Sequence, residues 1–315
     1  MNRRQLQMLA TRLASLSRHA TGGGGAPRLR GVTEGVSLWA ALLAVFVILA
    51  SPAHAQPQRI VSMNLCTDEL LMRIVDPSRI AAITYLSQQP VNAPLGLDSI
   101  SAKLPVNHGL AEEVIRLDPD LILAGQFAAT TATSLLTRLG YRVETFAPEN
   151  SFADMRANIR RLGELVGEPA RAEAVIADFD ARLAALQAQL PPGEKPVFAD
   201  IGVNNYIAGA NTLYTEVVNA GGYRTLGQAL GFEGFRNVPL ELILTVRPAL
   251  ISTATPWTSP PSMSTISLGH PALRALVERT PHITIPERYT TCGAPSMLGA
   301  VELLVEARKT GLSAP

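Results

Sequence analysis

The feature that most constrains the fold is a helix–proline–strand unit that occurs twice in the chain. The first copy, LAEEVIRLDPDLILAG, covers residues 110–125, and the second, PLELILTVRPALISTA, begins 129 residues later and covers 239–254. In each copy a glutamate, Glu112 or Glu241, stands seven residues before a proline. The residue before a proline is pushed out of the α region, so each copy predicts a short helix that ends there and an apolar strand that follows.

The same alternation extends along most of the chain. Strands and helical segments alternate over residues 56–150 and again over 193–315, which is typical of parallel β/α units. Between them, residues 151–192 are predicted to be almost entirely helical, because apolar side chains such as Phe179 and Leu186 recur at helical spacing. We therefore predict an α/β fold: two β/α lobes with parallel sheets, joined by one long interlobe helix, with a ligand cleft between the lobes.

Residues 1–55 are predicted to be a signal peptide with a long n-region. The apolar run VSLWAALLAVFVILA covers residues 36–50 and is shorter than the roughly 20 residues that span a bilayer. Arginines precede this run, and Ala53 and Ala55 follow it as an A-x-A cleavage site. We expect cleavage after Ala55 and a periplasmic location for the rest of the chain. An uncleaved membrane anchor is the alternative.

Charge and motifs limit the functions open to residues 56–315. This part holds 21 Lys and Arg against 25 Asp and Glu, a net charge of −4, which does not fit a nucleic-acid partner. It contains no G-x-S-x-G, H-E-x-x-H, C-x-x-C or P-loop sequence. Its histidines, His108, His270 and His282, are isolated in the sequence, whereas a zinc site needs several ligands that converge. We expect a binding protein rather than an enzyme, with no cofactor of its own.

The segments that follow the predicted strands hold the candidate ligand-binding residues, because ligands of open α/β sheets bind at the carboxyl ends of the strands. These segments combine aromatic with small polar side chains, which suits a flat, bulky organic ligand. The candidates are Asn64, Cys66, Tyr85 and Phe127 in the first lobe and Tyr206, Trp257, Arg288 and Cys292 in the second. For each residue taken alone, an ordinary loop or core role is an equal alternative.

The sequence leaves three states open for the two cysteines, Cys66 and Cys292. They can be free buried thiols, which are common. They can form an interlobe disulfide, as an even count in an oxidising compartment permits, although such a bond would hinder ligand exchange. They can also contact the ligand or its metal, because thiolate is a soft ligand for copper, zinc or iron. A periplasmic thiol-dependent metal-handling or redox protein that uses this pair is the alternative function.

Five segments together resemble a known family. In order along residues 59–251 they are RIVSMNLCTDELL, EEVIRLDPDLILAG, RLGYRVETF, ANTLYTEVVNAGG and VPLELILTVRPALI. They are similar to the periplasmic substrate-binding proteins of ABC importers for cobalamin, ferric siderophores and haem-like chelates, the class with a helical backbone between two lobes. The resemblance implies a monomer that captures a metal chelate (a cobalt corrinoid or an iron chelate) in its cleft and delivers it to an ABC permease dimer with its ATPase.

The resemblance also assigns roles to individual residues. In the family, one glutamate on each lobe fits an arginine-lined pocket on each permease subunit, and Glu112 and Glu241 stand at the matching positions, whereas Glu113 has no counterpart in the second copy. The alternative is that both acids compensate helix dipoles, since acidic residues favour the first helical turn. Phe235 lies six residues before Glu241, where the cobalamin binders carry an aromatic residue. This position favours a corrinoid or another large macrocycle over a catecholate chelate.

Overall fold

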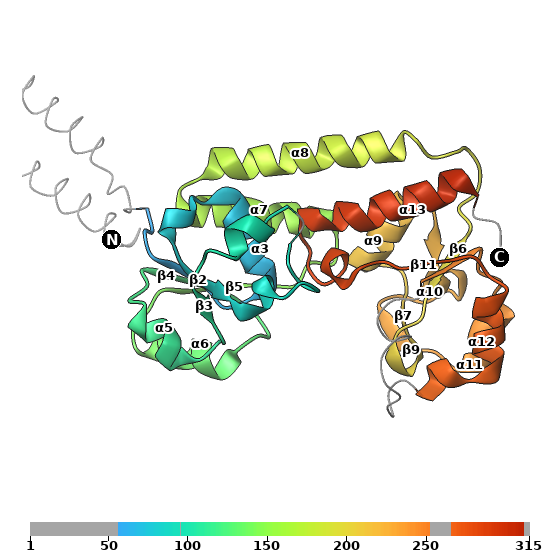
Figure 1. Cartoon of the computed structure of the whole chain (residues 1–315), viewed down its shortest axis with the longest axis horizontal. Coiled ribbons are helices and arrows are strands. Elements are labelled where there is room, and N and C mark those ends of the chain that lie inside the picture. The colour runs from blue at the N-terminus through green and yellow to red at the C-terminus, as the bar shows by residue number, and fades with distance from the viewer. Residues whose placement is uncertain (1–55, 95, 253–265, 312–315) are drawn as a thin grey trace, which may run out of the picture. The chain divides into compact units, whose positions relative to one another are not determined.

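The computed structural model of the chain describes residues 56–94, 96–252 and 266–311, and these form two β/α lobes (Figure 1). The α/β class with parallel sheets in two lobes confirms the prediction. The predicted signal peptide, residues 1–55, and the candidate Trp257 lie outside the described residues. Within the described ranges, no helix is both long and apolar enough to cross a membrane.

The first lobe is built on a five-stranded parallel sheet in the order β3-β2-β1-β4-β5. Its strands are β1 (Ile60–Ser62), β2 (Ile80–Thr84), β3 (Val106–Asn107), β4 (Leu121–Gly125) and β5 (Val143–Phe146). Its helices are α3 (Leu65–Ile74), α4 (Asp98–Ser101), α5 (Ala111–Arg116) and α6 (Thr130–Arg138). Helix α3 begins immediately after β1 because Asn64 caps it: the Asn64 Oδ1 accepts hydrogen bonds from the backbone N–H groups of Cys66 and Thr67.

The second lobe is built on a four-stranded parallel sheet in the order β11-β10-β6-β8, accompanied by an antiparallel pair of strands, β7 and β9. Its strands are β6 (Val197–Asp200), β7 (Tyr206–Ala208), β8 (Arg224–Thr225), β9 (Phe235–Asn237), β10 (Leu250–Ser252) and β11 (His282–Ile283). Its helices are α9 (Leu213–Ala220), α10 (Leu226–Ala229), α11 (Leu240–Thr245) and α12 (Pro271–Glu278). The periodicity of the sequence did not predict the β7–β9 pair.

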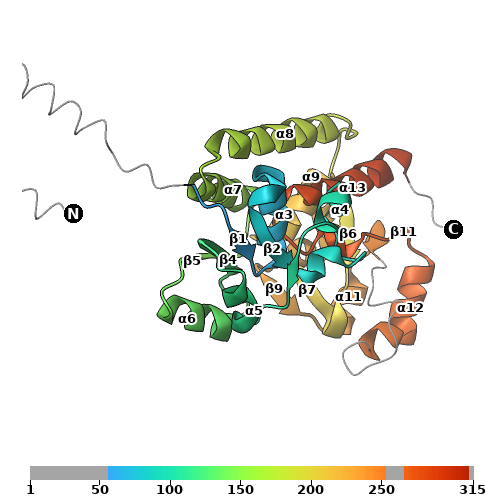
Figure 2. The same cartoon turned by 60° about the vertical axis from the view of Figure 1, so that its left-hand side comes forward.

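Two helices, α7 (Phe152–Val166) and α8 (Pro169–Gln187), connect the lobes along the chain. They are separate because Gly167 adopts a left-handed conformation (φ 74°) at the end of α7, and Pro169 then opens α8 at a position where proline is favoured. The buried residues of α8 are Ala172, Ile176, Phe179 and Leu183. This spacing gives one apolar stripe that packs against α7, α3 and α13 (Leu298–Thr310) (Figure 2).

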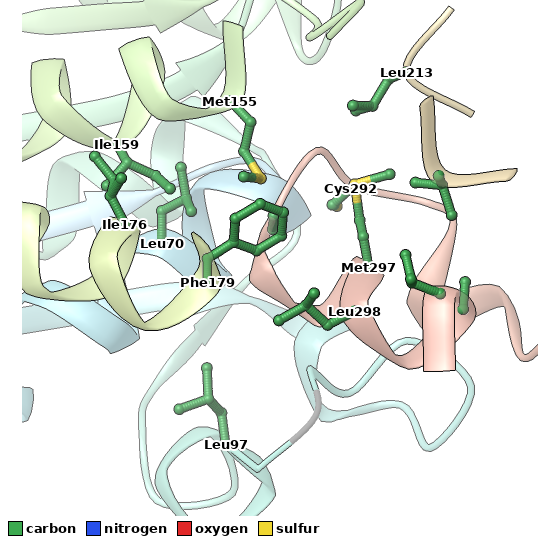
Figure 3. Packing of buried hydrophobic residues seen from close by; sticks show 14 of the residues in the cluster. Leu70, Leu97, Met155, Ile159, Ile176, Phe179, Leu213, Cys292, Met297 and Leu298 are labelled. Atoms are coloured by element: carbon green, nitrogen blue, oxygen red, sulfur yellow. The ribbon is translucent and has the colours of Figure 1, made fainter. Parts of the chain in front are cut away.

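Alternate residues of each sheet face two different cores. Ile60 and Leu121 in the first sheet and Phe198 and Leu250 in the second belong to one continuous core, together with α3, α7, α8, α9 and α13. Figure 3 shows part of this shared core, with the ring of Phe179 among side chains from both lobes. On its other face, each sheet has a core of its own, formed with α5 and α6 in the first lobe and with α10, α11 and α12 in the second.

Candidate ligand-binding site

A cavity of about 450 Å³ is lined by residues of both lobes. In the first sheet the chain moves outward from β1 to β2 and β3, and then returns to place β4 and β5 on the other side of β1. The switch point between β1 and β4 opens onto this cavity, as expected for ligand sites of open parallel sheets. The lining consists of Asn64, Cys66, Thr67, Leu70, Gly125, Gln126, Phe127, Ala128, Phe146, Ala147, Pro148, Glu149, Asn150, Leu213, Tyr214, Phe235, Thr290, Thr291, Cys292, Gly293 and Met297.

Two neighbouring strand ends form the first-lobe wall at the switch point. Asn64 follows β1, and Gly125, Gln126 and Phe127 follow or end β4. The two segments approach so closely that a Cβ on Gly125 would lie only 2.7 Å from the Asn64 Nδ2. Glycine at this position therefore permits the Asn64 amide to pack beside β4 while its oxygen caps α3.

The structure joins Cys66 and Cys292 in a disulfide, with 5.1 Å between their Cα atoms. This is one of the three states that the sequence left open. The disulfide excludes the other two states, the free thiols and the metal-binding thiolates, because both require reduced cysteines. Both cysteines line the cavity, so the bond is part of its lining and connects the first turn of α3 with the segment that precedes α13.

A buried carboxylate strengthens the same connection. Glu69 of α3 is 3% exposed and accepts hydrogen bonds at its two oxygens from the backbone N–H (3.0 Å) and the hydroxyl (2.7 Å) of Ser296. Arg73, one turn further along α3, forms an ion pair with Glu69 at 2.8 Å. Because the charge is paired and hydrogen-bonded, its burial is tolerated. The two lobes therefore meet at a covalent and a polar contact only one helical turn apart.

The neighbouring residue, Asp68, is fully buried on the other side of α3. Its Oδ2 accepts hydrogen bonds from the Thr84 backbone and hydroxyl and from the Ser87 hydroxyl, while Oδ1 has no partner within the described residues. Burial raises the pKa of Asp68 to about 7, although the surrounding hydroxyl groups act in the opposite direction. Asp68 thus anchors α3 to the end of β2, behind the cavity wall.

Aromatic rings extend from the cavity on both lobes. Phe127 of the first lobe is 75% exposed and Phe235 of the second is 49% exposed, and both line the cavity. Tyr206 does not line it. Instead its ring stacks on Phe235, with centroids 5.4 Å apart and planes inclined by 8°. The β7–β9 pair therefore presents a two-ring platform beside the cavity, a feature that the sequence patterns did not reveal.

Two predicted site residues lie elsewhere. Tyr85 follows β2 in a short 3-10 helix and stacks on His108, with ring centroids 4.8 Å apart. Arg288 lies in a 3-10 helix, Glu287–Tyr289, ahead of the segment that reaches the cavity. Neither residue lines the cavity. Tyr85 follows β2, which lies one strand away from the switch point between β1 and β4. Arg288 precedes the lining segment, which begins at Thr290. The site described here does not include them.

The two ionisable side chains of the lining, Glu149 and Tyr214, were not among the candidates selected from the sequence. Glu149 comes three residues after the end of β5, so the rule that ligand residues follow strands would have found it if applied to that strand as well. Burial raises the pKa of the Glu149 carboxyl. Tyr214 lies in the first turn of α9, where no sequence signal marks it, and its phenol interacts with the Asp200 carboxyl. Burial raises the pKa of both groups of this pair.

The two repeated glutamates occupy equivalent places. Glu112 is the second residue of α5 and Glu241 the second residue of α11, and each helix has six residues and covers the outer face of its sheet. Both side chains are exposed, and within the described residues neither forms an ion pair or accepts a hydrogen bond. Glu113 differs: its oxygens accept a hydrogen bond from the His108 backbone and approach its ring, and the backbone contact lowers the pKa of Glu113.

Two β/α lobes that line one cavity between them are the architecture of periplasmic binding proteins. A model of the periplasmic binding protein family matches residues 60–267, and the chain belongs to this family. A cobalamin-binding protein of Halobacterium salinarum is 25% identical over 210 residues, or 63% of this chain and 54% of that protein. The chain thus spans about half the length of the curated relatives it matches.

Solved structures share the fold at low sequence identity. A periplasmic haem-binding protein of Roseiflexus sp. RS-1 is 18% identical with a TM-score of 0.63, over 81% of this chain and 98% of that one. A periplasmic vitamin B12-binding protein of Vibrio cholerae is 19% identical with a TM-score of 0.60, again over 81% and 98% of the two chains. In the described part of the present chain, no group of three or more His, Cys, Asp or Glu side chains is placed to hold a metal ion.

Proposed function

We propose that this protein is the solute-binding component of an ABC importer and that it captures a metal chelate in the cavity and delivers it to the membrane permease. The observation that carries the proposal is the cavity at the β1–β4 switch point, which both lobes line. Membership of the periplasmic binding protein family supports it. The predicted signal peptide and the disulfide fit a protein that functions in the oxidising periplasm.

The exposed rings support a large, flat ligand. Phe127 and Phe235 come from opposite lobes and border the same cavity, and Tyr206 holds the Phe235 ring by stacking. Exposed aromatic side chains that gather at a cavity mouth gain free energy when a ligand covers them. A cobalt corrinoid or a haem-like macrocycle presents a face of this kind. Solved structures with this fold include a haem-binding protein and a vitamin B12-binding protein.

The exposed glutamates support a docking role for the outer helices. Glu112 and Glu241 stand at the same position of equivalent helices on the two lobes and have no partner of their own within the described residues. Two carboxylates on a stiff body can engage two cationic pockets on a permease dimer, one for each subunit. Helix-dipole compensation needs only one acidic residue in a first turn and does not require the two places to match.

The ligand is tested by purification from the native periplasm, followed by absorbance spectroscopy and mass spectrometry of what co-purifies. A corrinoid, haem or iron chelate in equimolar amount is the expected result. The protein purified without ligand should then bind the same compound. If no metal chelate co-purifies and none binds to the empty protein, the proposed function is wrong.

Docking is tested by charge reversal, with Glu112→Lys and Glu241→Lys together in one variant. Uptake by cells should be abolished while the ligand affinity of the purified variant stays unchanged, because neither residue lines the cavity. Glu164→Lys, which reverses another exposed carboxylate on α7, is the matched control and should leave uptake intact. Normal uptake by the double variant would show that these acids do not dock.

A further inference from the structure

The cavity lining has a negatively charged side chain and no positively charged one among the described residues. Glu149 is the only Asp, Glu, Lys, Arg or His side chain among its lining residues. The nearest arginine in sequence to Phe235 is Arg236, whose guanidinium lies over the Phe232 ring at 5.3 Å and not in the lining. Residues 253–265, which the structure does not describe, contain no Asp, Glu, Lys, Arg or His in their sequence. A ligand in this cavity therefore meets one carboxylate and, among the described residues, no cation.

The Glu149 carboxylate is held in place at the wall. Its Oε1 accepts a hydrogen bond of 2.6 Å from the Asn158 Nδ2 on α7. Its Oε2 lies against Gly293, so closely that a Cβ atom added to that glycine would be only 2.5 Å from the oxygen. Burial raises the pKa of this group, so some of its solvation has already been lost. Among the described residues, Oε1 accepts from Asn158, and Oε2 has no donor from another residue.

Tyr214, the other ionisable group of the lining, does not compensate for this charge. Its phenol interacts with the Asp200 carboxyl at the end of β6. Burial and the adjacent carboxyl raise the Tyr214 pKa well above its ordinary value, so the hydroxyl keeps its proton. A tyrosinate that could ligate ferric iron, as in some haem proteins, is therefore not formed at this position.

We propose that Glu149 selects the ligand by charge: the cavity takes a neutral or cationic chelate whose rim carries N–H donors, and it rejects chelates that place a carboxylate there. The proposal rests on the function proposed above. A corrin ring, which carries carboxamide groups around its rim, can donate to the free Glu149 oxygen. Haem, with two propionates, and an anionic siderophore would each bring a like charge into a partly desolvated site, which costs binding free energy.

The test compares cyanocobalamin with its monocarboxylate isomers, in each of which one propionamide is hydrolysed, by isothermal titration of the purified protein. The wild-type protein should bind at least one isomer about tenfold or more weakly than cyanocobalamin. Glu149→Gln keeps the shape of the side chain and an acceptor for Asn158, and should reduce that ratio to about threefold or less. Glu149→Asp keeps the charge and should retain the discrimination.

Two further variants complete the design. Glu149→Ala also removes the charge and should also lose the discrimination between the isomers. It keeps the test decisive if the glutamine variant does not fold. Glu164→Gln removes one exposed carboxylate from α7 and should behave as the wild type, because long-range charge is not the cause.

Tight cyanocobalamin binding with the same isomer ratio in the wild type, Glu149→Gln and Glu149→Ala would overturn the role of Glu149 and leave the proposed function standing. Haemin bound more tightly than cyanocobalamin by the wild type would likewise overturn the charge selection. If the wild type binds none of these compounds and no ferric siderophore, the proposed function fails and this inference fails with it.

Discussion

The shared core and the outer helices differ in what holds them in place. The shared core collects buried side chains from both lobes around α8, and a disulfide and the Glu69–Ser296 hydrogen bonds lie at its edge. Helices α5 and α11 have six residues each, and their glutamates, Glu112 and Glu241, face solvent. The interior thus joins the lobes, while the glutamates of the outer helices take no part in that connection. Substitutions in the two regions should therefore affect different measurements.

The largest loss of stability is expected from Phe179→Ala in the shared core. The Phe179 ring is fully buried and packs edge-on against Phe152, 5.4 Å between centroids, and under the Arg156 guanidinium. The substitution should lower the free energy of unfolding by about 3–5 kcal/mol, measured by urea denaturation, because it removes a large buried side chain and leaves a cavity. Leu242→Ala, at a half-exposed position of α11, is the control. If both substitutions lower the free energy of unfolding equally, the shared core does not contribute more to stability than the outer helices.

Removal of the disulfide should have the next largest effect. Cys66→Ser together with Cys292→Ser deletes a cross-link between residues 226 positions apart and should lower the free energy of unfolding by about 2–5 kcal/mol. Denaturation of the variant is compared with that of the wild type, each with and without dithiothreitol. The reductant should destabilise only the wild type. If it has no effect on the wild type, the two sulfurs are not bonded in solution.

Asp68→Asn should change the pH dependence of stability. The Asp68 pKa is raised from 3.8 to about 7 in the folded protein, so between these pH values the folded state holds a proton that the unfolded state has released. The free energy of unfolding therefore falls as pH rises through this window, and the stabilisation is complete only below pH about 4. Relative to the asparagine variant, the wild type should lose a few kcal/mol, on the order of 1–4, from pH 4 to pH 7.

Thermal or urea unfolding at each pH provides this measurement. Asp178→Asn, which removes an exposed carboxylate from α8, serves as the control and should leave the pH profile close to that of the wild type. Parallel profiles for the wild type and Asp68→Asn would show that Asp68 is ionised at the same pH in both the folded and unfolded states.

The smallest effect on stability is expected at the rim. Phe127→Ala removes a ring that is 75% exposed, so the free energy of unfolding should change by less than about 0.5 kcal/mol. Affinity for the co-purified chelate should fall by about 1 kcal/mol, roughly fivefold, because one ring contact with the ligand is lost. Leu139→Ala, another exposed apolar position away from the cavity, should change neither quantity. Unchanged affinity in Phe127→Ala would remove this ring from the site.

Local patterns predicted much of the fold. The Pro119 and Pro248 signals placed α5 before β4 and α11 before β10, and the apolar spacing of α8 predicted its buried stripe. Helix α3 begins three residues earlier than its apolar pattern suggests, because the Asn64 cap and not hydrophobic spacing sets its start. Short strands such as β8 and the β7–β9 pair were not predicted, since two or three residues carry too little periodicity to detect.

The candidate site was predicted in outline only. Of the residues that the strand-end rule selected, Asn64, Phe127 and both cysteines line the cavity, because the rule depends on topology, which the alternation of strands and helices reveals. The same rule also selected Tyr85, which faces His108 instead, since the rule does not say which strands flank the switch point. The bond between the cysteines depends on how the chain folds back at its end, and no local pattern carries that information.

The return of the chain to α3 has a consequence for the order in which the molecule can be completed. The partners of Cys66 and Glu69 are Cys292 and Ser296, which are synthesised more than 220 positions later. By then all the strands that the structure describes in both sheets have been made. Each lobe can begin to fold as it emerges, as domains do during synthesis. The part of the cavity lining that contains Cys292 is added only with the final segment. The lining of the cavity is therefore complete only when this final segment has joined α3.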